Sequence, residues 1–190
     1  MRKNILSIPI TLDGYIEGPN RERDWVIADD ELHDYHTHLL ENADLVLFGR
    51  VTYELLANYW PTATSDPSLP AGMRRFAEAI NPMPKVVFSK TLSDVGWNTK
   101  IVRSIDPQEI KELEKKAGGN MVLLGGATAI QAFIQHGLID ELQLLVHPVA
   151  IGSGKPLLGD IHSLQKLDFL RRQVFQSGVV ALCYQPDGKV

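Results

Sequence analysis

Two short segments of this 190-residue chain place glycine and polar residues directly after an apolar run. They are Leu47-Phe48-Gly49-Arg50-Val51-Thr52 and Leu123-Leu124-Gly125-Gly126-Ala127-Thr128. Where a strand leads into a helix, small residues leave the free N–H groups of the helix start open to an anion, and Arg50 adds a positive charge. A tight turn with an arginine salt bridge is the alternative for either segment alone. Two such segments in one small sheet favour a pyrophosphate-binding site.

Other motifs for nucleotides and nucleophiles are missing. The dinucleotide fingerprint Gly-x-Gly-x-x-Gly and the serine turn Gly-x-Ser-x-Gly do not occur, which counts against an ordinary dehydrogenase fold and a serine hydrolase. The stretch Gly152 to Pro156 superficially resembles a nucleoside-triphosphate loop. Pro156 stands where that loop needs Ser or Thr, and Val149 stands where it needs its first glycine. We therefore reject that interpretation.

Two titratable residues are candidates for a catalytic role. Asp13 lies just past the first predicted strand, beside Gly14, where loops of such folds cover an active site. The alternative is an Asp-Gly pair that only forms a turn. His36 lies in the middle of an apolar helical stripe. It is either a satisfied imidazole at the edge of the core or a ring at the floor of a pocket.

Metal ligands are not expected. Cys183 is the single cysteine, so an intrachain disulfide and a cysteine-based zinc site are excluded. His33, His36 and His38 are close in sequence, but no two of them have the i, i+4 spacing of a zinc pair on one helical face.

The elements that position these residues alternate between strands and helices. The predicted strands are Ile5 to Ile10, Asp44 to Phe48, Val86 to Ser89, Ile101 to Arg103, Met121 to Leu124, Glu141 to His147, Leu167 to Phe175 and Val179 to Gln185. The predicted helices are Asp30 to Asn42, Thr52 to Tyr59, Ala71 to Ile80, a segment from the N-cap Asp106 to about Lys116, and Ala127 to Gln135. The predicted loops are Thr11 to Asn20, Pro61 to Pro70 and Val149 to Asp160. This order predicts an α/β fold with one mostly parallel sheet of about eight strands and an antiparallel hairpin at its edge.

Composition sets the remaining limits. The chain is 44% hydrophobic and 22% charged, with a net charge of −4, which is typical of a globular protein with one domain over residues 1–190. A mildly acidic chain is a poor candidate for binding nucleic acid or an anionic membrane. No apolar run is long enough for a membrane span, and the N-terminus is too weakly apolar for a signal peptide, so we expect a cytoplasmic protein.

Taken together and in order, several segments resemble the dihydrofolate reductase-like superfamily. The similarity is to stand-alone relatives of the reductase domain of bacterial riboflavin biosynthesis. It rests on segments of residues 7–159: Ser7 to Ile16, Val46 to Glu54, Lys85 to Lys90, Leu123 to Ala127, Ile139 to Leu142 and Pro148 to Gly154. Each is short, and the ordered set is specific. The zinc deaminase motifs His-x-Glu and Pro-Cys-x-x-Cys of the bifunctional riboflavin enzyme are absent, which excludes deamination.

The resemblance implies a three-layer fold and an NADPH-dependent oxidoreductase acting on a small heterocycle, as a pyrimidine reductase or a dihydrofolate reductase does. It implies that Asp13 lies near the nicotinamide and the substrate. The implied cofactor-binding residues are Gly49, Arg50, Thr52, Ser89, Lys90, Gly125, Gly126, Ala127 and Thr128. A homodimer is also implied. A non-catalytic nucleotide-binding or metabolite-binding protein on the same fold is the alternative. Folate reductases carry a carboxylate on the inner face of the first helix, where this chain has His36.

Overall fold

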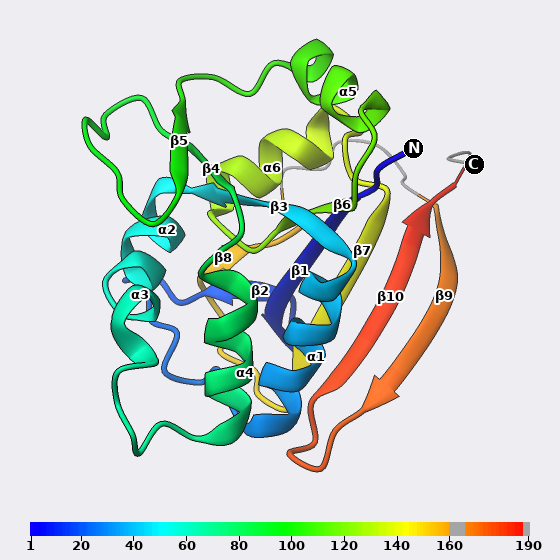
Figure 1. Cartoon of the computed structure of the whole chain (residues 1–190). Helices are drawn as coiled ribbons and strands as arrows, with labels where there is room; N and C mark the ends of the chain where they lie inside the picture. Colours follow the sequence, from blue (N-terminus) through cyan, green and yellow to red (C-terminus); the bar gives the residue numbers. More distant parts are fainter. Residues whose placement is uncertain (160–165, 188–190) are drawn as a thin grey trace.

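The computed structural model describes residues 1–159 and 166–187, so Asp160, the last residue of the predicted glycine-rich loop, lies outside it. Eight strands form one sheet in the order β5-β4-β3-β6-β1-β7-β10-β9 (Figure 1). They are β1 Asn4–Thr11, β3 Ala43–Gly49, β4 Lys85–Phe88, β5 Thr99–Val102, β6 Asn120–Leu123, β7 Glu141–His147, β9 Leu167–Val174 and β10 Val180–Pro186. The ladders from β5 to β7 are all parallel, and β10 runs antiparallel to both β7 and β9. The predicted α/β architecture is confirmed.

Helices cover both faces of the sheet, which makes three layers (Figure 1). Helices α5 (Pro107–Lys115) and α6 (Ala127–Gln135) supply Ile110, Ile130 and Phe133 to the core on one face. On the other face lie α1 (Asp30–Glu41), α2 (Arg50–Ala57), α3 (Trp60–Ala63) and α4 (Ala71–Ile80). Within β1 the alternation of side chains sends Leu6 and Ile8 toward the α6 face. Ser7 points to the α1 face, where it meets His36.

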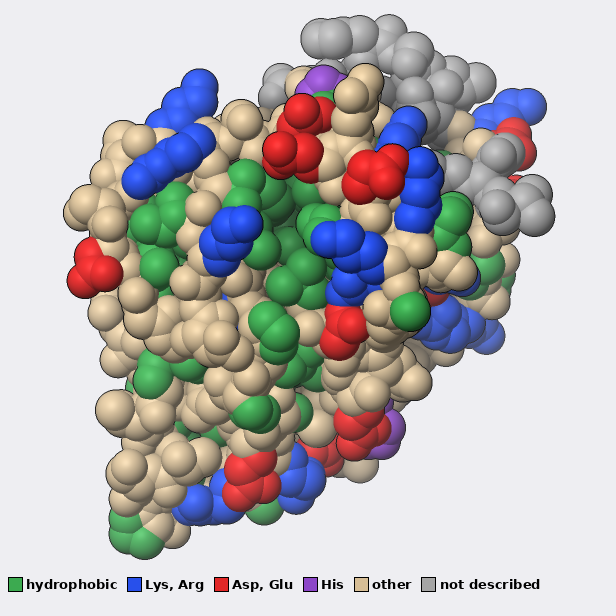
Figure 2. Space-filling model, turned by 45° about the horizontal axis from the view of Figure 1, so that its top comes forward, with side chains coloured by type: hydrophobic (Ala, Val, Ile, Leu, Met, Phe, Trp, Pro, Cys, Tyr) green, Lys and Arg blue, Asp and Glu red, His purple; other side chains and the backbone are tan. Residues whose placement is uncertain are grey.

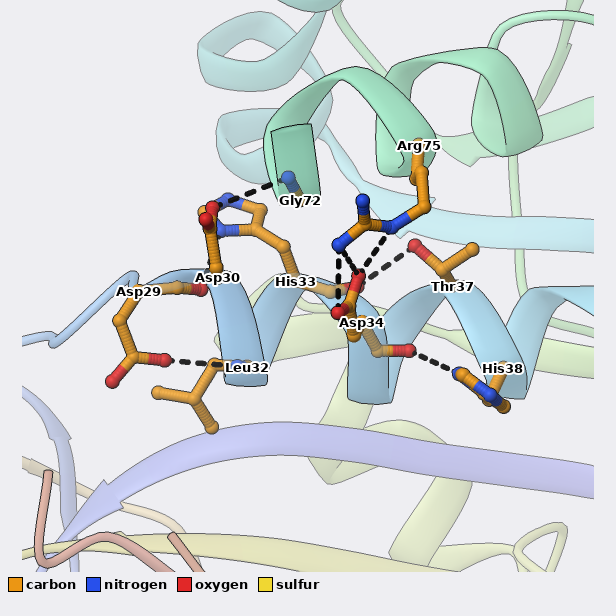
Figure 3. Close-up of polar contacts among 9 residues, drawn as sticks. All are labelled: Asp29, Asp30, Leu32, His33, Asp34, Thr37, His38, Gly72 and Arg75. Carbon is orange, nitrogen blue, oxygen red and sulfur yellow. Dashed lines mark hydrogen bonds and ion pairs between the residues drawn. The ribbon is translucent and has the colours of Figure 1, made fainter. Parts of the chain in front are cut away.

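The contact between α1 and α4 is built from carboxylates (Figure 3). The side chain of Asp29 accepts a hydrogen bond from Leu32 N, which caps α1. The carboxylate of Asp30 accepts a hydrogen bond from Gly72 N at 3.2 Å, so it pairs with a free backbone N–H group in the first turn of α4. Asp34 accepts two hydrogen bonds from the guanidinium of Arg75, both at 2.8 Å. The acidic residues at the start of α1 therefore satisfy two helix N-termini.

Three short elements differ from the prediction. Residues Tyr15–Glu17 form β2 and residues Lys155–Pro156 form β8, and the two pair in a separate small sheet inside the predicted loops. Helix α3 occupies part of the predicted loop from Pro61 to Pro70. These elements are too short to show a period, and they form because of partners distant in sequence.

The C-terminal hairpin forms the edge of the sheet. Strand β10 is half buried against β7, whereas all eight residues of β9 are exposed. Four of those exposed side chains are apolar: Leu167, Phe169, Leu170 and Val174. None of the described helices is long and apolar enough to cross a membrane.

Candidate functional site

A cleft of about 840 Å³ lies at the carboxyl ends of the parallel strands. Open α/β sheets bind their ligands at this edge. Eight of the nine predicted cofactor-binding residues line the cleft: Gly49, Arg50, Thr52, Ser89, Lys90, Gly126, Ala127 and Thr128. The ninth, Gly125, lies directly behind them, where its carbonyl accepts a hydrogen bond from Gly49 N at 2.9 Å. The fold therefore brings the predicted set together from β3, β4 and β6.

The two glycine segments touch each other. A Cβ atom on Gly49 would lie 2.8 Å from Gly126 Cα, and Gly126 has a φ of +97°. At Gly125, with a φ of +148°, a Cβ atom would lie 2.8 Å from Thr52 Oγ1. Glycine at these positions is thus required by the approach of one backbone to another, in addition to any approach of a ligand. The sequence analysis weighed a ligand-binding junction against a tight turn and did not predict this contact between the two segments.

Both helices that start at this contact have open N-termini. Gly49 is the N-cap of α2 and Gly126 is the N-cap of α6, so neither start has a side-chain cap, and neither first turn contains an acidic residue. The first N–H groups of a helix have no partner inside the helix and carry its positive dipole end. Two such ends converging on one cleft form a natural site for a pyrophosphate.

The charges in the cleft lining have mostly one sign. Five cationic side chains line it, and Glu17 is the one carboxylate among its described lining residues; the cations are Arg21, Arg23, Arg50, Lys90 and Arg103. In the view of Figure 2, basic and acidic side chains are interspersed. Arg50 donates to Glu54 at 2.8 Å, one helical turn further on, and both side chains are partly exposed. This lining suits a ligand with several negative charges.

The turn after β4 is fixed by internal hydrogen bonds. The hydroxyl oxygen of Ser89 accepts from Leu92 N at 3.0 Å. Arg103 donates to the carbonyl oxygens of Ser89 and Leu92 at 3.1 and 2.6 Å. These contacts hold the turn that carries Lys90 at one end of the cleft.

Asp13 does not line this cleft. Its carboxylate accepts from the hydroxyl of Thr11 at 2.6 Å, from Ile151 N at 3.1 Å and from Gly152 N at 2.7 Å. These hydrogen bonds, that of Thr11 first, lower the pKa of Asp13 below its ordinary value. Its observed task is to join the start of the β2 hairpin to the glycine-rich loop. The turn alternative describes this contact, and a catalytic role stays a prediction.

His36 lies on the opposite face of the sheet from Ile8, which lines the cleft. Its Nδ1–H donates to the carbonyl oxygen of Leu32 at 2.9 Å, and the hydroxyl of Ser7 donates to Nε2 at 3.3 Å. Burial lowers the pKa of His36 to about 4, so the ring is neutral at pH 7. The geometry matches the alternative of a satisfied imidazole at the edge of the core.

Sequence reasoning missed several residues of the lining. Arg21 and Arg23 come from the irregular segment between β2 and α1, and Arg103, Ser104 and Ile105 follow β5. No period reveals such loop residues. The one available signal was the pair of arginines in Arg21-Glu22-Arg23, which follows the predicted loop from Thr11 to Asn20.

Comparisons with known proteins agree with this architecture. The profile of the RibD C-terminal domain family matches residues 2–181. The uncharacterized protein YyaP of Bacillus subtilis (strain 168) is 35% identical over 187 residues, which cover 98% of this chain and 96% of YyaP. A crystal structure from Shewanella sp. PV-4, of a protein described as a riboflavin biosynthesis protein, superposes with a TM-score of 0.73 at 25% identity, covering 97% and 99% of the two chains. The Thermotoga maritima deaminase/reductase superposes with a TM-score of 0.66 at 17% identity, over 97% of this chain and 56% of that longer one.

Proposed function

Because this chain belongs to the RibD C-terminal domain family, we propose that it is an NADPH-dependent reductase of a small heterocycle of the pyrimidine or pterin type. The family and the reductase-like fold support the reaction class. One observation supports the cofactor assignment most strongly: the uncapped N-termini of α2 and α6 lie next to each other, where Gly49 contacts Gly126.

The residues present fit such a cofactor. The N–H groups that begin α2 and α6 would hold the pyrophosphate, and Arg50, Lys90 and Arg103 would surround the phosphate of the adenosine half. When bound, the cofactor supplies a hydride. Ile8, Ile16 and Phe88 give the lining apolar surface that excludes water from the reacting groups. The ionised Asp13 fixes the loop at 151–152 and is a poor proton donor in this position.

Thermal melting with NADPH and with NADH tests the cofactor assignment. At a ligand concentration about 100 times the dissociation constant, NADPH should stabilise the fold by about 2.7 kcal/mol. Replacing Arg50 with Ala should weaken NADPH more than NADH, because the extra phosphate of NADPH needs local cations. If millimolar NADPH does not raise the melting temperature, the proposal is wrong. Equal loss for both cofactors would assign Arg50 to the shared pyrophosphate and the selectivity to Ser89 and Lys90.

Oxidation of NADPH separates a reductase from a non-catalytic binding protein on the same fold. The loss of absorbance of NADPH is followed with a panel of pyrimidine and pterin substrates. Turnover with one of them supports the reductase. Tight NADPH binding without turnover on the whole panel favours the alternative, a nucleotide sensor.

A homodimer is part of the same proposal. The exposed edge strand β9 supports it, since Phe169 and Val174 lie on a strand with no neighbour on its outer side in the described part of the chain. Exposed apolar edge strands are the sites at which sheets pair with another chain. Light scattering measures the molar mass of the wild type and of Phe169→Lys. We expect the wild type to be a dimer and the variant to be a monomer. A monomeric wild type at micromolar concentration would contradict it.

A further inference from the structure

A second cavity, of about 690 Å³, lies on the α1 face of the sheet, between α1 and the C-terminal hairpin (Figure 1). It shares no lining residue with the cleft that we assign to the cofactor. The two cavities also lie at opposite ends of the strands, because Ile5, Asn120 and Glu141 line this one from the amino ends of β1, β6 and β7. A ligand can therefore occupy this cavity without displacing one from the cleft.

The floor of the cavity is a chain of hydrogen bonds that converges on one carboxylate. The hydroxyl of Tyr35 donates to Gln143 Oε1 at 2.9 Å, and Gln143 Nε2 donates to Glu141 Oε1 at 2.7 Å. Arg171 Nη2 donates to the same carboxylate oxygen at 2.6 Å. Gln143 and Glu141 are both buried. Because a carboxylate only accepts, it fixes the orientation of the Gln143 amide, and the amide in turn fixes the hydroxyl of Tyr35. These polar groups are thus held in place before any ligand binds.

The contact between Arg171 and Glu141 leaves part of each group available. An arginine that faces a carboxylate frequently donates two parallel hydrogen bonds to it. Here one nitrogen donates to one oxygen. Within residues 1–159 and 166–187, Glu141 Oε2 accepts no hydrogen bond and the other nitrogens of Arg171 donate none. The side chain of Arg171 is 54% exposed, and both residues line the cavity. The cavity therefore offers a hydrogen-bond acceptor and a donor next to each other.

The charges around this cavity cancel, unlike those of the cleft. Its lining contains the charged side chains of Lys3, Glu31, Asp34, Glu141 and Arg171. Arg75 adds a positive charge from outside the cavity, because it donates to Asp34. The two lining cations and Arg75 thus balance the three carboxylates, with histidine counted as neutral. Such surroundings favour a neutral ligand over an ion.

We propose that this cavity is a second ligand site, which binds a neutral heterocycle through the N–H and C=O groups of a lactam. The lactam N–H would donate to Glu141 Oε2, and the adjacent C=O would accept from Arg171. Ile5 and Leu39 also line the cavity and give apolar contact to a ring. This site is independent of the proposed function, because no residue of the cleft takes part in it.

The test uses the full chain and 2-pyridone, a small neutral lactam, in an amide NMR titration into the millimolar range. The signals of Glu141, Gln143 and Arg171 should shift. The matched compound 1-methyl-2-pyridone lacks the N–H group and should bind at least about 10-fold more weakly. Glu141→Gln should weaken 2-pyridone by about 10-fold or more, because its oxygen stays with Gln143 and Arg171 and its NH₂ group then faces the lactam N–H.

Arg171→Gln should weaken 2-pyridone as well, since it removes the donor to the lactam oxygen. Arg172→Gln is the matched control and should bind like the wild type, because Arg172 is exposed and points to the other face of the sheet. Adding NADPH should leave the affinity for 2-pyridone unchanged, whether or not the cleft binds that cofactor.

Three results would overturn the proposal. The first is equal binding of the two pyridones by the wild type, which decides the matter even if a variant fails to fold. The second is unchanged binding in folded Glu141→Gln and Arg171→Gln. The third is an absence of shifts at β7 and β9, including shifts confined to the cleft or lost when NADPH is added. Failure of the proposed function looks different: NADPH does not bind, while 2-pyridone still shifts the signals of β7 and β9.

Discussion

Apart from the four-residue α3, which starts at Tyr59 without a side-chain cap, the described helices begin in two different ways. Helices α1 and α5 start with aspartates whose side chains accept from Leu32 N and Gln108 N, and α4 receives Asp30 from its neighbour (Figure 3). Helices α2 and α6 start at glycine, with no side-chain cap and no acid in the first turn. A glycine at the N-cap in place of Ser, Thr, Asn or Asp costs on the order of a few tenths of a kcal/mol. The two helix starts without a cap face one cleft, which supports the proposal that their free N–H groups bind the cofactor.

Gly126→Ala should have the largest effect on stability. It tests how much the glycine at the start of α6 matters to the fold. The new Cβ would enter the space of Gly49 at a positive φ, so the free energy of unfolding should fall by about 2 to 6 kcal/mol. Gly137→Ala is the control, because Gly137 also has a positive φ, +61°, and faces open space. It should cost about 1 to 2 kcal/mol. Equal costs in urea unfolding would show that the backbone contact is unimportant.

The stability of the fold should depend on pH through His36 of α1. The folded state holds the pKa of His36 near 4, below its ordinary 6.5, because burial disfavours the charged ring. The unfolded chain therefore binds more protons between these values, and the stabilisation present above pH 6.5 is lost as the pH falls toward 4. The loss is about 3 kcal/mol at most. In urea unfolding across this range, the difference between wild type and His36→Gln should follow that curve; parallel curves would contradict the neutral, buried ring.

Thr128→Asp converts an open helix start into one that resembles α1. Thr128 is exposed in the first turn of α6 and lines the cleft. A carboxylate there should stabilise the free protein by about 0.3–1 kcal/mol. It should weaken NADPH about 10-fold to 100-fold, because it competes with the pyrophosphate for the same N–H groups. The neutral Thr128→Asn is the control for shape. If the Asp variant binds NADPH as tightly as the Asn variant does, the start of α6 does not bind the pyrophosphate.

Asp29→Ala should show the smallest effect, on stability alone. Loss of its hydrogen bond to Leu32 N should lower the free energy of unfolding by about 1 kcal/mol, with no change in nucleotide binding. Calorimetric melting with and without NADPH measures both quantities. A clear loss of NADPH affinity would mean that α1 belongs to the binding site.

Much of this division was predictable from the sequence. Asp106 was expected to cap its helix, and a helix was expected to start at Asp30. The two glycine segments were expected at strand-to-helix junctions. These features are local, because a cap or a junction depends on residues within one turn of each other.

The parts that were not predicted depend on contacts between distant residues. Asp13 binds the backbone of residues 151–152, His36 meets Ser7 on the far face of the sheet, and Arg23 enters the cleft from an irregular loop. A helical stripe shows that His36 faces inward, but not which face of the sheet it meets. Residues 15–17 and 155–156 become strands only because they find each other.

The most direct test of the central claim is an amide NMR titration of the whole chain with NADPH. The account predicts the largest shifts at the backbone N–H groups of Arg50, Val51, Ala127 and Thr128, which begin α2 and α6. The N–H groups of Leu32 and Gln108 already donate hydrogen bonds to Asp29 and Asp106, so their chemical shifts should not change. Shifts confined to α1 and α5, or none at α2 and α6 under saturating NADPH, would contradict the account.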